Sequence, residues 1–150
     1  MADPAVLRRH AIRLHETAPD RDSAIRICGE VLADVGAVSP AYTAAMLERE
    51  RSISTYVGEG VAIPHGTLAS KEDVHGDAIA VVRFPDGVDW DGQPVRVCVP
   101  IAARGDGHVA LLSALAAILL DPEAARALRD AEDPDDVIRL LEPVGKETTT

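Results

Sequence analysis

Apolar residues recur at helical spacing in five segments of the chain, and proline marks the start of three of them. Three dipeptides each place a capping side chain directly before a proline: Ser39-Pro40, Asp121-Pro122 and Asp133-Pro134. That order is favoured at a helix N-terminus, because the side chain accepts from free backbone amides and proline needs no amide partner there. These starts predict helices over 40–49, 122–131 and 134–141. Two more helices are expected over 22–34 and 108–120, and the second is apolar nearly all round, as in a buried helix.

Short β-branched runs between these segments predict strands. They cover residues 11–14, 61–63, 78–84, 88–90 and 95–102. Because Pro85-Asp86-Gly87 is typical of a turn, we expect it to end one strand before the next begins. The near-continuous apolar run over 95–102 indicates a central strand covered on both faces. Strands interleaved with helices predict an α/β (α+β) fold, in which a mixed, roughly five-stranded sheet carries helices on both faces.

One domain accounts for the length of the chain. Its 150 residues are enough for a single domain with a substantial core. We place this domain at residues 1–144 and expect a disordered tail over 145–150. No apolar run reaches the roughly 18 residues of a membrane span, and the first residues lack the basic and apolar regions of a signal peptide. We therefore expect a cytoplasmic protein.

The charge balance narrows the class of partner. The chain has 15 Lys and Arg against 25 Asp and Glu, a formal net charge of -10 at pH 7. A surface of that sign repels phosphate backbones and anionic lipids, which argues against binding to nucleic acid or to a membrane surface. It favours a basic protein partner instead, through long-range electrostatic steering.

The sequence contains no nucleotide-binding loop. Gly58-Glu59-Gly60 begins like a dinucleotide-binding motif, but Ile63 stands where the third glycine belongs, and the predicted elements do not surround it with a strand and a helix. A phosphate loop ending in Gly-Lys-Ser or Gly-Lys-Thr is also missing from the sequence. We therefore expect no cofactor, and any phosphoryl group that the chain handles has to come from another molecule.

His65 is the candidate nucleophile. Pro64 restricts the residue before it to an extended conformation, and Gly66 permits a sharp turn directly after it. A histidine in that setting is held by the backbone at the end of a strand. Neutral imidazole can attack phosphorus through a nitrogen lone pair. The residues alone leave a second interpretation open, in which His65 only forms a hydrogen bond with its own turn.

Two blocks of sequence carry a family resemblance. The first joins Met46-Leu-Glu-Arg-Glu-Arg51 to Thr55-Tyr-Val-Gly-Glu-Gly-Val-Ala-Ile-Pro-His65-Gly-Thr67, and the second is Pro100-Ile-Ala-Ala-Arg-Gly-Asp-Gly-His108. Together they resemble the signature of the mannitol/fructose-type EIIA domains of the bacterial sugar phosphotransferase system, over about residues 10–142. The resemblance implies a mixed five-stranded sheet flanked by helices. It also implies a histidine that takes phosphate from phospho-HPr and passes it to a cysteine on an EIIB domain, so that a membrane is involved only through the EIIBC permease.

The resemblance assigns three site residues. His65 matches the phosphorylated histidine, His108 matches a second histidine that faces it, and Arg49 matches an arginine beside them. The chemistry suits these residue types, because a transferring phosphoryl group spreads negative charge over three oxygens and needs donors around them. Arg49 offers planar donors, and His108 starts a predicted helix, whose N-terminus favours anions. Simpler roles stay open, namely a capping or surface position for His108 and an exposed ion pair with a neighbouring glutamate for Arg49.

The remaining polar residues and cysteines suggest no second site. We interpret Glu59 as solvated or facing a partner, because its charge would repel a phosphate, and Thr67 as a turn cap. His10, His15 and His75 are expected at the surface, and Cys28 and Cys98 are expected to be buried structural residues.

Three functions follow from these observations. The first is a free-standing EIIA of the mannitol type, and the second is a regulatory EIIA of the nitrogen-related phosphotransferase branch. The third is a metal-binding domain built on His65 and His108, for which only two ligands are in view.

Overall fold

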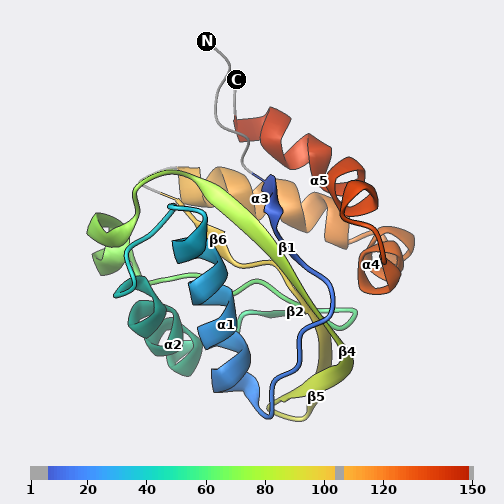
Figure 1. Ribbon diagram of the computed structural model, residues 1–150, viewed down its shortest axis with the longest axis horizontal. Coiled ribbons are helices and arrows are strands. Elements are labelled where there is room, and N and C mark those ends of the chain that lie inside the picture. Colours follow the sequence, from blue (N-terminus) through green and yellow to red (C-terminus); the bar gives the residue numbers. More distant parts are fainter. Residues whose placement is uncertain (1–6, 104–106, 149–150) are drawn as a thin grey trace.

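A computed structural model describes residues 7–103 and 107–148 of the chain (Figure 1). The strands are β1 (Leu7–Arg13), β2 (Tyr56–Gly58), β3 (Val61–Ala62), β4 (Ala78–Trp90), β5 (Gln93–Cys98) and β6 (Ile101–Ala102). The helices are α1 (Arg21–Asp34), α2 (Tyr42–Ser52), α3 (Gly107–Leu119), α4 (Pro122–Asp130) and α5 (Pro134–Thr148), and a short 3-10 helix covers Leu68–Asp73. None of the helices, as far as they are described, is long and apolar enough to cross a membrane.

The strands form one mixed sheet, as the sequence predicts. Its order is β1-β4-β5-β3-β2, and β6 also pairs with β4. β1 runs parallel to β4 and β3 runs parallel to β5, whereas β4 is antiparallel to both β5 and β6. The sheet therefore has six strands where we expected about five. The predicted strand 95–102 is divided and β2 was not predicted, whereas the predicted strands 78–84 and 88–90 form the single strand β4.

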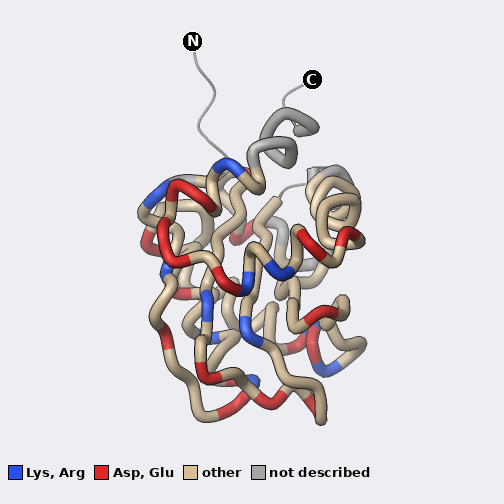
Figure 2. Tube along the Cα trace, turned by 90° about the vertical axis from the view of Figure 1, so that its right-hand side faces the viewer, with Lys and Arg blue, Asp and Glu red and all other residues tan. Residues whose placement is uncertain are grey.

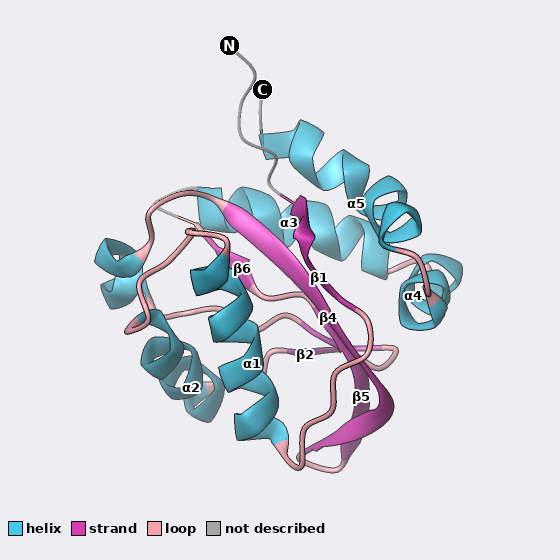
Figure 3. Ribbon diagram, in the orientation of Figure 1, coloured by secondary structure: helices cyan, strands magenta, loops and turns pink. Residues whose placement is uncertain are grey.

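Helices cover both faces of this sheet, which confirms the predicted architecture (Figures 1 and 3). Side chains of β4 alternate between two hydrophobic clusters, since successive residues of a strand point to opposite faces. Ala80 and Val82 join the cluster that contains α1 and α2. Ile79 and Val81 join the cluster that contains α3, α4 and α5. The two buried faces make the sheet a rigid centre on which the loops at its edges are built.

The Pro85-Asp86-Gly87 turn predicted inside this region does not end a strand. β4 continues through it to Trp90, and the step from Arg83 to Val88 lies opposite the shorter step from Val97 to Val95 on β5. The extra residues are accommodated as a bulge, in which Gly87 adopts a φ of 81°. A bulge absorbs turn-forming residues when the flanking strand segments both find partners.

The predicted strand over 95–102 is interrupted by Pro100. β5 ends at Cys98 and β6 begins at Ile101. Proline has no amide hydrogen to donate to a neighbouring strand, although the carbonyl of Pro100 still accepts from the amide of Ala80. The apolar run is buried as expected, and after the break β6 pairs with β4.

The bounds of α2 and α5 differ most from the predicted ones, and α2 ends at Ser52 and not at about Arg49. α2 begins at Tyr42 without a side-chain cap, because the Ser39 hydroxyl instead donates to the carboxylate of Asp73, 2.8 Å away. α5 begins at Pro134 with Asp133 accepting from the amide of Asp135, as predicted, but it continues to Thr148 and not to about Leu141. A helix that has already formed extends at low cost, and it therefore includes part of the segment expected as a tail.

α3 is buried on one face and not all round. Leu111, Leu115 and Leu119 lie in the core, whereas Ala116 and Ala117 are exposed. Its apolar composition comes partly from these outward-facing alanines, which are good helix formers.

Candidate functional site

His65 lies just beyond β3, where the chain runs beside β6. Its backbone forms a parallel bridge with Ile101, and the Ile101 amide donates to the Pro64 carbonyl at 2.9 Å. The side chain is only 5% exposed. The predicted position of the histidine at the end of a strand is therefore confirmed, and the partner strand is a buried one.

The imidazole of His65 is held in one orientation. Its Nδ1 lies 2.8 Å from the carbonyl oxygen of Ile63. Because a carbonyl oxygen can only accept, Nδ1 carries the hydrogen in this arrangement. In the neutral ring Nε2 then carries the lone pair, which makes Nε2 the nitrogen that can attack an electrophile.

Tyr42 of α2 supports the loop after the histidine. Its hydroxyl accepts from the Gly66 amide at 2.8 Å and donates to the Ile101 carbonyl at 2.9 Å. A Cβ atom on Gly66 would lie 2.5 Å from the Tyr42 ring and 2.6 Å from the Ser70 hydroxyl. Close packing therefore requires glycine at this position, where φ is not positive.

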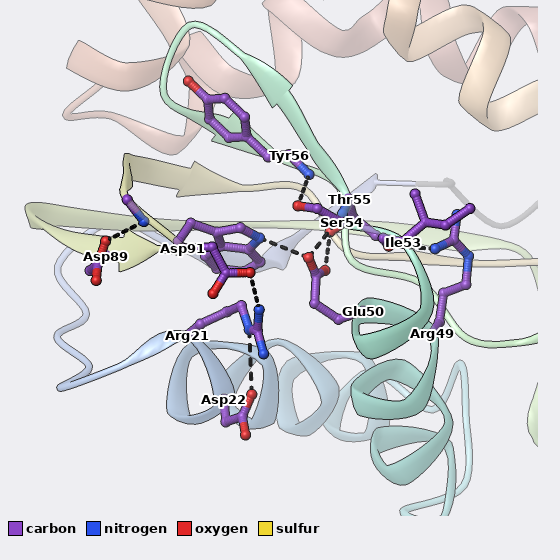
Figure 4. Close-up of polar contacts among 12 residues, drawn as sticks. Arg21, Asp22, Arg49, Glu50, Ile53, Ser54, Thr55, Tyr56, Asp89 and Asp91 are labelled. Carbon is purple, nitrogen blue, oxygen red and sulfur yellow. Dashed lines mark hydrogen bonds and ion pairs between the residues drawn. The ribbon is translucent and has the colours of Figure 1, made fainter.

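Backbone pairing and one side-chain bond connect Arg49 with the β2–β3 hairpin, which leads into the histidine loop. Tyr56 pairs with Ala62, and the Ile63 amide donates to the Thr55 carbonyl at 3.0 Å. The Arg49 guanidinium donates to the Ile53 carbonyl at 2.6 Å (Figure 4). This contact differs from the ion pair with a neighbouring glutamate that we left open.

Glu50 fixes the end of α2 from which Arg49 projects. It is buried, and its carboxylate accepts from the Thr55 amide at 2.9 Å, the Thr55 hydroxyl at 2.5 Å and the Trp90 indole at 2.9 Å (Figure 4). A carboxylate buried among three donors is well compensated. These bonds tie α2 to the start of β2 and to β4, so that residues 50–55 form a fixed bend beneath the Arg49 side chain.

His108 belongs to the first turn of α3, but its side chain lies outside the described residues, as does the segment 104–106 before the helix. The backbone of β6, which carries Ile101 beside His65, leads directly into that segment. The topology therefore brings the start of α3 toward the end of the sheet where His65 lies. The predicted pairing of His108 with His65 stays a prediction.

Glu59 lies at the opposite end of the hairpin. Extended pairing from Gly60 to Pro64 along β5 and β6 separates Gly60 from His65 by roughly 16 Å at about 3.3 Å per residue. The exposed Glu59 carboxylate lies 3.6 Å from the Arg129 guanidinium, which also donates to the Glu59 carbonyl. Thr67 accepts from Ser70 through its carbonyl, so its backbone and not its side chain closes the turn.

Two large apolar side chains are exposed along the segment that joins the end of α2 to β2. Ile53 is 67% exposed and Val57 is 48% exposed, while Glu48 and Glu59 nearby in sequence are exposed acids. We refer to Ile53 and Val57 as the exposed apolar pair. Sequence patterns did not single them out, because an apolar residue in a strand or loop is normally expected to be buried.

The other histidines and both cysteines lie where the sequence predicted. His10, His15 and His75 are exposed. Cys28 and Cys98 are buried free thiols in contact with each other, and burial raises the pKa of the Cys98 thiol well above its usual range, with the neighbouring Cys28 adding to the effect. Across the described residues no group of three His, Cys, Asp or Glu side chains could hold a metal ion, and nothing in that part of the chain supports the metal-binding alternative.

Comparison with known proteins identifies the family. The chain is 38% identical over 141 residues to the mannitol-specific phosphotransferase enzyme IIA component of Halalkalibacterium halodurans, covering 94% of this chain and 97% of that protein. It is 40% identical over 131 residues to a multiphosphoryl transfer protein of Xanthomonas campestris, covering 87% of this chain but only 16% of that much longer protein.

A solved structure agrees with these relatives. The fold matches that of the Escherichia coli complex of enzyme IIAMTL and phosphorylated enzyme IIBMTL with a TM-score of 0.83 at 32% identity, covering 91% of this chain and 98% of that one. Residues 5–143 match the family described as phosphoenolpyruvate-dependent sugar phosphotransferase system, EIIA 2. With nearly the whole chain matched, and with His65 held at the end of β3 as described, the protein belongs to the EIIA 2 family of the phosphoenolpyruvate-dependent sugar phosphotransferase system.

Proposed function

We propose that this EIIA domain carries a phosphoryl group for the uptake of mannitol or a fructose-like sugar. It accepts the group from phospho-HPr on His65 and donates it to a cysteine of an EIIB domain. The observation that carries this proposal is the setting of His65, which is buried at a strand end with Nδ1 committed to the Ile63 carbonyl. A fixed ring with one defined nucleophilic nitrogen is what repeated, reversible phosphoryl transfer requires.

The names of the relatives support mannitol as the sugar. A relative that this chain matches over almost its full length is named mannitol-specific, and the matching E. coli structure is described as a complex with phosphorylated enzyme IIBMTL. A transport role in the mannitol branch is therefore preferred to a regulatory role in the nitrogen-related branch, which no feature of the described site favours.

The transfer step needs no cofactor. The Nε2 lone pair of His65 attacks phosphorus as the nitrogen–phosphorus bond of phospho-HPr breaks, and that electron pair stays on the donor's imidazole. Nδ1–H remains bonded to the Ile63 carbonyl throughout, and this bond strengthens as the ring gains positive character. In the second step the cysteine thiolate of EIIB attacks the same phosphorus, and the electron pair of the Nε2–phosphorus bond returns to His65.

Arg49 and His108 are proposed as catalytic residues that stabilise the moving charge. The Arg49 guanidinium is anchored to the Ile53 carbonyl by one donor, which leaves further donors of the same planar group for phosphoryl oxygens. His108 stands in the first turn of α3, where a helix N-terminus favours an anion.

The exposed apolar pair, Ile53 and Val57, is proposed as the centre of the face that docks both partners. Exposed apolar side chains are suited to brief contact with another protein. Exposed Glu48 and Glu59 supply acidic residues near it, and acidic positions are spread over the outside of the molecule (Figure 2). Such a face attracts a donor with basic residues around its own active histidine.

A cytoplasmic location is part of the same proposal. Cys28 and Cys98 are adjacent free thiols, which is the usual state of cysteines in a reducing compartment.

The proposed function is tested by phosphotransfer from phosphoenolpyruvate through purified Enzyme I and HPr, followed by mapping of the modified residue. We expect phosphate on His65 only, and no transfer by His65→Ala, which removes the nucleophile and leaves the packed sheet intact. His75→Ala is the matched control, because it deletes an exposed histidine and should transfer at the wild-type rate. Phosphate on a cysteine or on another histidine, with His65 unmodified, would overturn the assignment.

A further inference from the structure

A single buried hydroxyl joins the elements that carry the candidate site. Tyr42 belongs to α2, the helix from which Arg49 projects, and it is only 4% exposed. Its hydroxyl bonds to the peptide group directly after His65 and to the carbonyl of Ile101 in β6. We propose that Tyr42 is a positioning residue for phosphoryl transfer. Its hydroxyl holds the backbone at His65 against β6 and at a fixed position relative to α2. This inference rests on the proposed function and adds a residue to it.

Ile101 holds the peptide groups on both sides of His65. On the N-terminal side its amide donates directly to the Pro64 carbonyl at 2.9 Å. On the C-terminal side its carbonyl is joined to the Gly66 amide through the Tyr42 hydroxyl. Ile101 itself pairs with Ile79 of the central strand β4. The histidine backbone is therefore fixed at two points to the middle of the sheet, and the hydroxyl provides one of them.

The direction of these bonds is defined. The Gly66 amide can only donate and the Ile101 carbonyl can only accept, so the hydroxyl must accept from the first and donate to the second. Donation requires the protonated hydroxyl. Burial raises the pKa of Tyr42 and outweighs the opposing effect of the Gly66 bond. The hydroxyl therefore keeps its proton at neutral pH, and both hydrogen bonds can form.

The Tyr42 ring packs closely against the loop after His65, and the hydroxyl adds the bonds that fix the loop's position on the ring. The space beside Gly66 is filled by the Tyr42 ring and the Ser70 hydroxyl, to the point that even a Cβ atom would not fit. The ring therefore packs against one side of the loop, and the hydroxyl bonds determine where along the ring the loop lies. Removing the hydroxyl alone keeps this packing but allows the loop to shift along the ring.

Position matters here because the Nε2 lone pair has to be aligned with the breaking bond of the donor. A misplacement of about 1 Å is enough to slow a reaction by as much as 10²-fold. The Nδ1 bond to Ile63 orients the ring relative to the residues before it, whereas the Tyr42 bond fixes the residue after it. Loss of the second contact is expected to let the ring shift and to weaken the preference for hydrogen on Nδ1.

The test compares Tyr42→Phe with Tyr56→Phe. The chain has two tyrosines, and the Tyr56 hydroxyl also accepts from a glycine amide, that of Gly60 at 3.4 Å, at the far end of the hairpin. Both variants thus lose one hydroxyl bonded to one glycine. Single-turnover transfer from phospho-HPr is measured over a range of donor concentrations, and the His65 tautomer is measured by nitrogen-15 NMR of the imidazole.

For Tyr42→Phe we expect transfer at saturating donor to slow about tenfold, a modest part of what misalignment can cost, with the half-saturating donor concentration within twofold of wild type. We also expect a smaller fraction of the His65 ring with hydrogen on Nδ1. Tyr56→Phe should match wild type in both measurements.

Two results would overturn the inference. One is unchanged transfer in Tyr42→Phe, and the other is slow transfer with an unaltered His65 spectrum, which would indicate a purely structural role. A wild-type chain that accepts no phosphoryl group would overturn the proposed function and this inference together. Normal wild-type transfer with an unaffected Tyr42→Phe variant would overturn the inference alone.

Discussion

His65 combines burial with polar contacts that leave little choice of orientation. Its Nδ1 hydrogen goes to the Ile63 carbonyl, and both neighbouring peptide groups are bonded to β6 directly or through Tyr42. A nucleophile that keeps its position between reactions does not have to be reordered at each turnover. For a carrier that meets two different partners, this fixed geometry means that the partners adapt to the histidine.

Arg49 is the residue whose role depends most directly on charge. Arg49→Ala removes donors that we propose for the phosphoryl oxygens, and loss of one such donor typically costs about 10²–10³ in rate. We expect phospho-HPr to modify His65 in this variant, but about that much more slowly, as measured by rapid quench. Arg51→Ala, which removes an exposed arginine from the same last turn of α2, is the matched control. Equal rates for both variants would place Arg49 outside the site.

Tyr42 also predicts a pH dependence of stability. Burial raises the pKa of Tyr42 above its ordinary value of 10.0, so the unfolded chain releases this proton at a lower pH than the folded chain. The stability that the protonated hydroxyl contributes is therefore complete below pH 10.0 and is lost as the pH rises from there through the folded-state pKa.

Urea unfolding tests this sign. The wild type should be more stable than Tyr42→Phe at about pH 8, and the difference should shrink by about pH 11. A difference that stays constant over this range would show that the hydroxyl ionises equally well in both states.

At the scale of elements, the β2–β3 hairpin links α2 to the histidine loop. Its antiparallel register pairs Tyr56 with Ala62, and the Ile63 amide donates to the Thr55 carbonyl. Glu50 fixes the bend that leads into the hairpin. The hairpin is short, with three residues in β2 and two in β3, so it gains its stability from these side-chain bonds and from pairing with β5. Any change that loosens the bend is expected to displace Arg49, which is bonded to the Ile53 carbonyl within it.

Glu50→Gln tests that link through stability. The two oxygens of the Glu50 carboxylate accept from the Trp90 indole and from the amide and hydroxyl of Thr55. Glutamine has one carbonyl oxygen, so at least one of these three donors loses its acceptor. An unsatisfied buried polar group costs about 1–3 kcal/mol. We expect the free energy of unfolding to fall by about that amount, and the fluorescence of Trp90, the single tryptophan, to change in the folded state. Glu30→Gln, at an exposed position of α1, should be neutral. A stable variant with unaltered fluorescence would contradict the proposed bend.

The sequence predicts helices and the central strands well where local signals are strong. Asp121 and Asp133 cap their helices as expected, and the histidine motif points to the end of a strand. Long-range pairing accounts for what was missed. Pro85-Asp86-Gly87 becomes a bulge because β5 pairs on both sides of it, and Ser39 leaves its cap because Asp73 accepts from it.

Within the candidate site, too, some residues can be found from local sequence and others only from the fold. His65 could be singled out from its neighbours in sequence, and the prediction of its role for phosphate transfer stands on the family resemblance. Tyr42 could not be found from pattern, because a tyrosine near a helix start is ordinary until the fold places Gly66 and Ile101 against its hydroxyl. The exposure of Ile53 likewise depends on which side of the hairpin faces solvent.

At the scale of the molecule, two buried layers hold the sheet while the site occupies one end of it. Helices on both faces give the central strands their rigidity. The loop after β3, which carries His65, is held on this rigid support. The net charge of -10 gives the whole molecule a negative electrostatic field. At low salt this field extends far beyond contact distance, because the screening length is about 30 Å at 0.01 M.

This field predicts the salt dependence of transfer. Steered association of an acidic carrier with a basic donor weakens as the screening length falls to about 8 Å at physiological salt. We expect the second-order rate constant for phosphoryl transfer from phospho-HPr, measured at sub-saturating donor, to fall several-fold from low to high salt. The rate within the bound complex should barely change, because apolar contact and fixed donors are not screened in the same way. Glu48→Gln, at an exposed position of α2 five residues before Ile53, should reduce the low-salt rate more than Glu123→Gln, an exposed acid in the first turn of α4. If the second-order rate constant does not respond to salt, the acidic surface serves solubility, and the exposed apolar pair alone must hold the complex together.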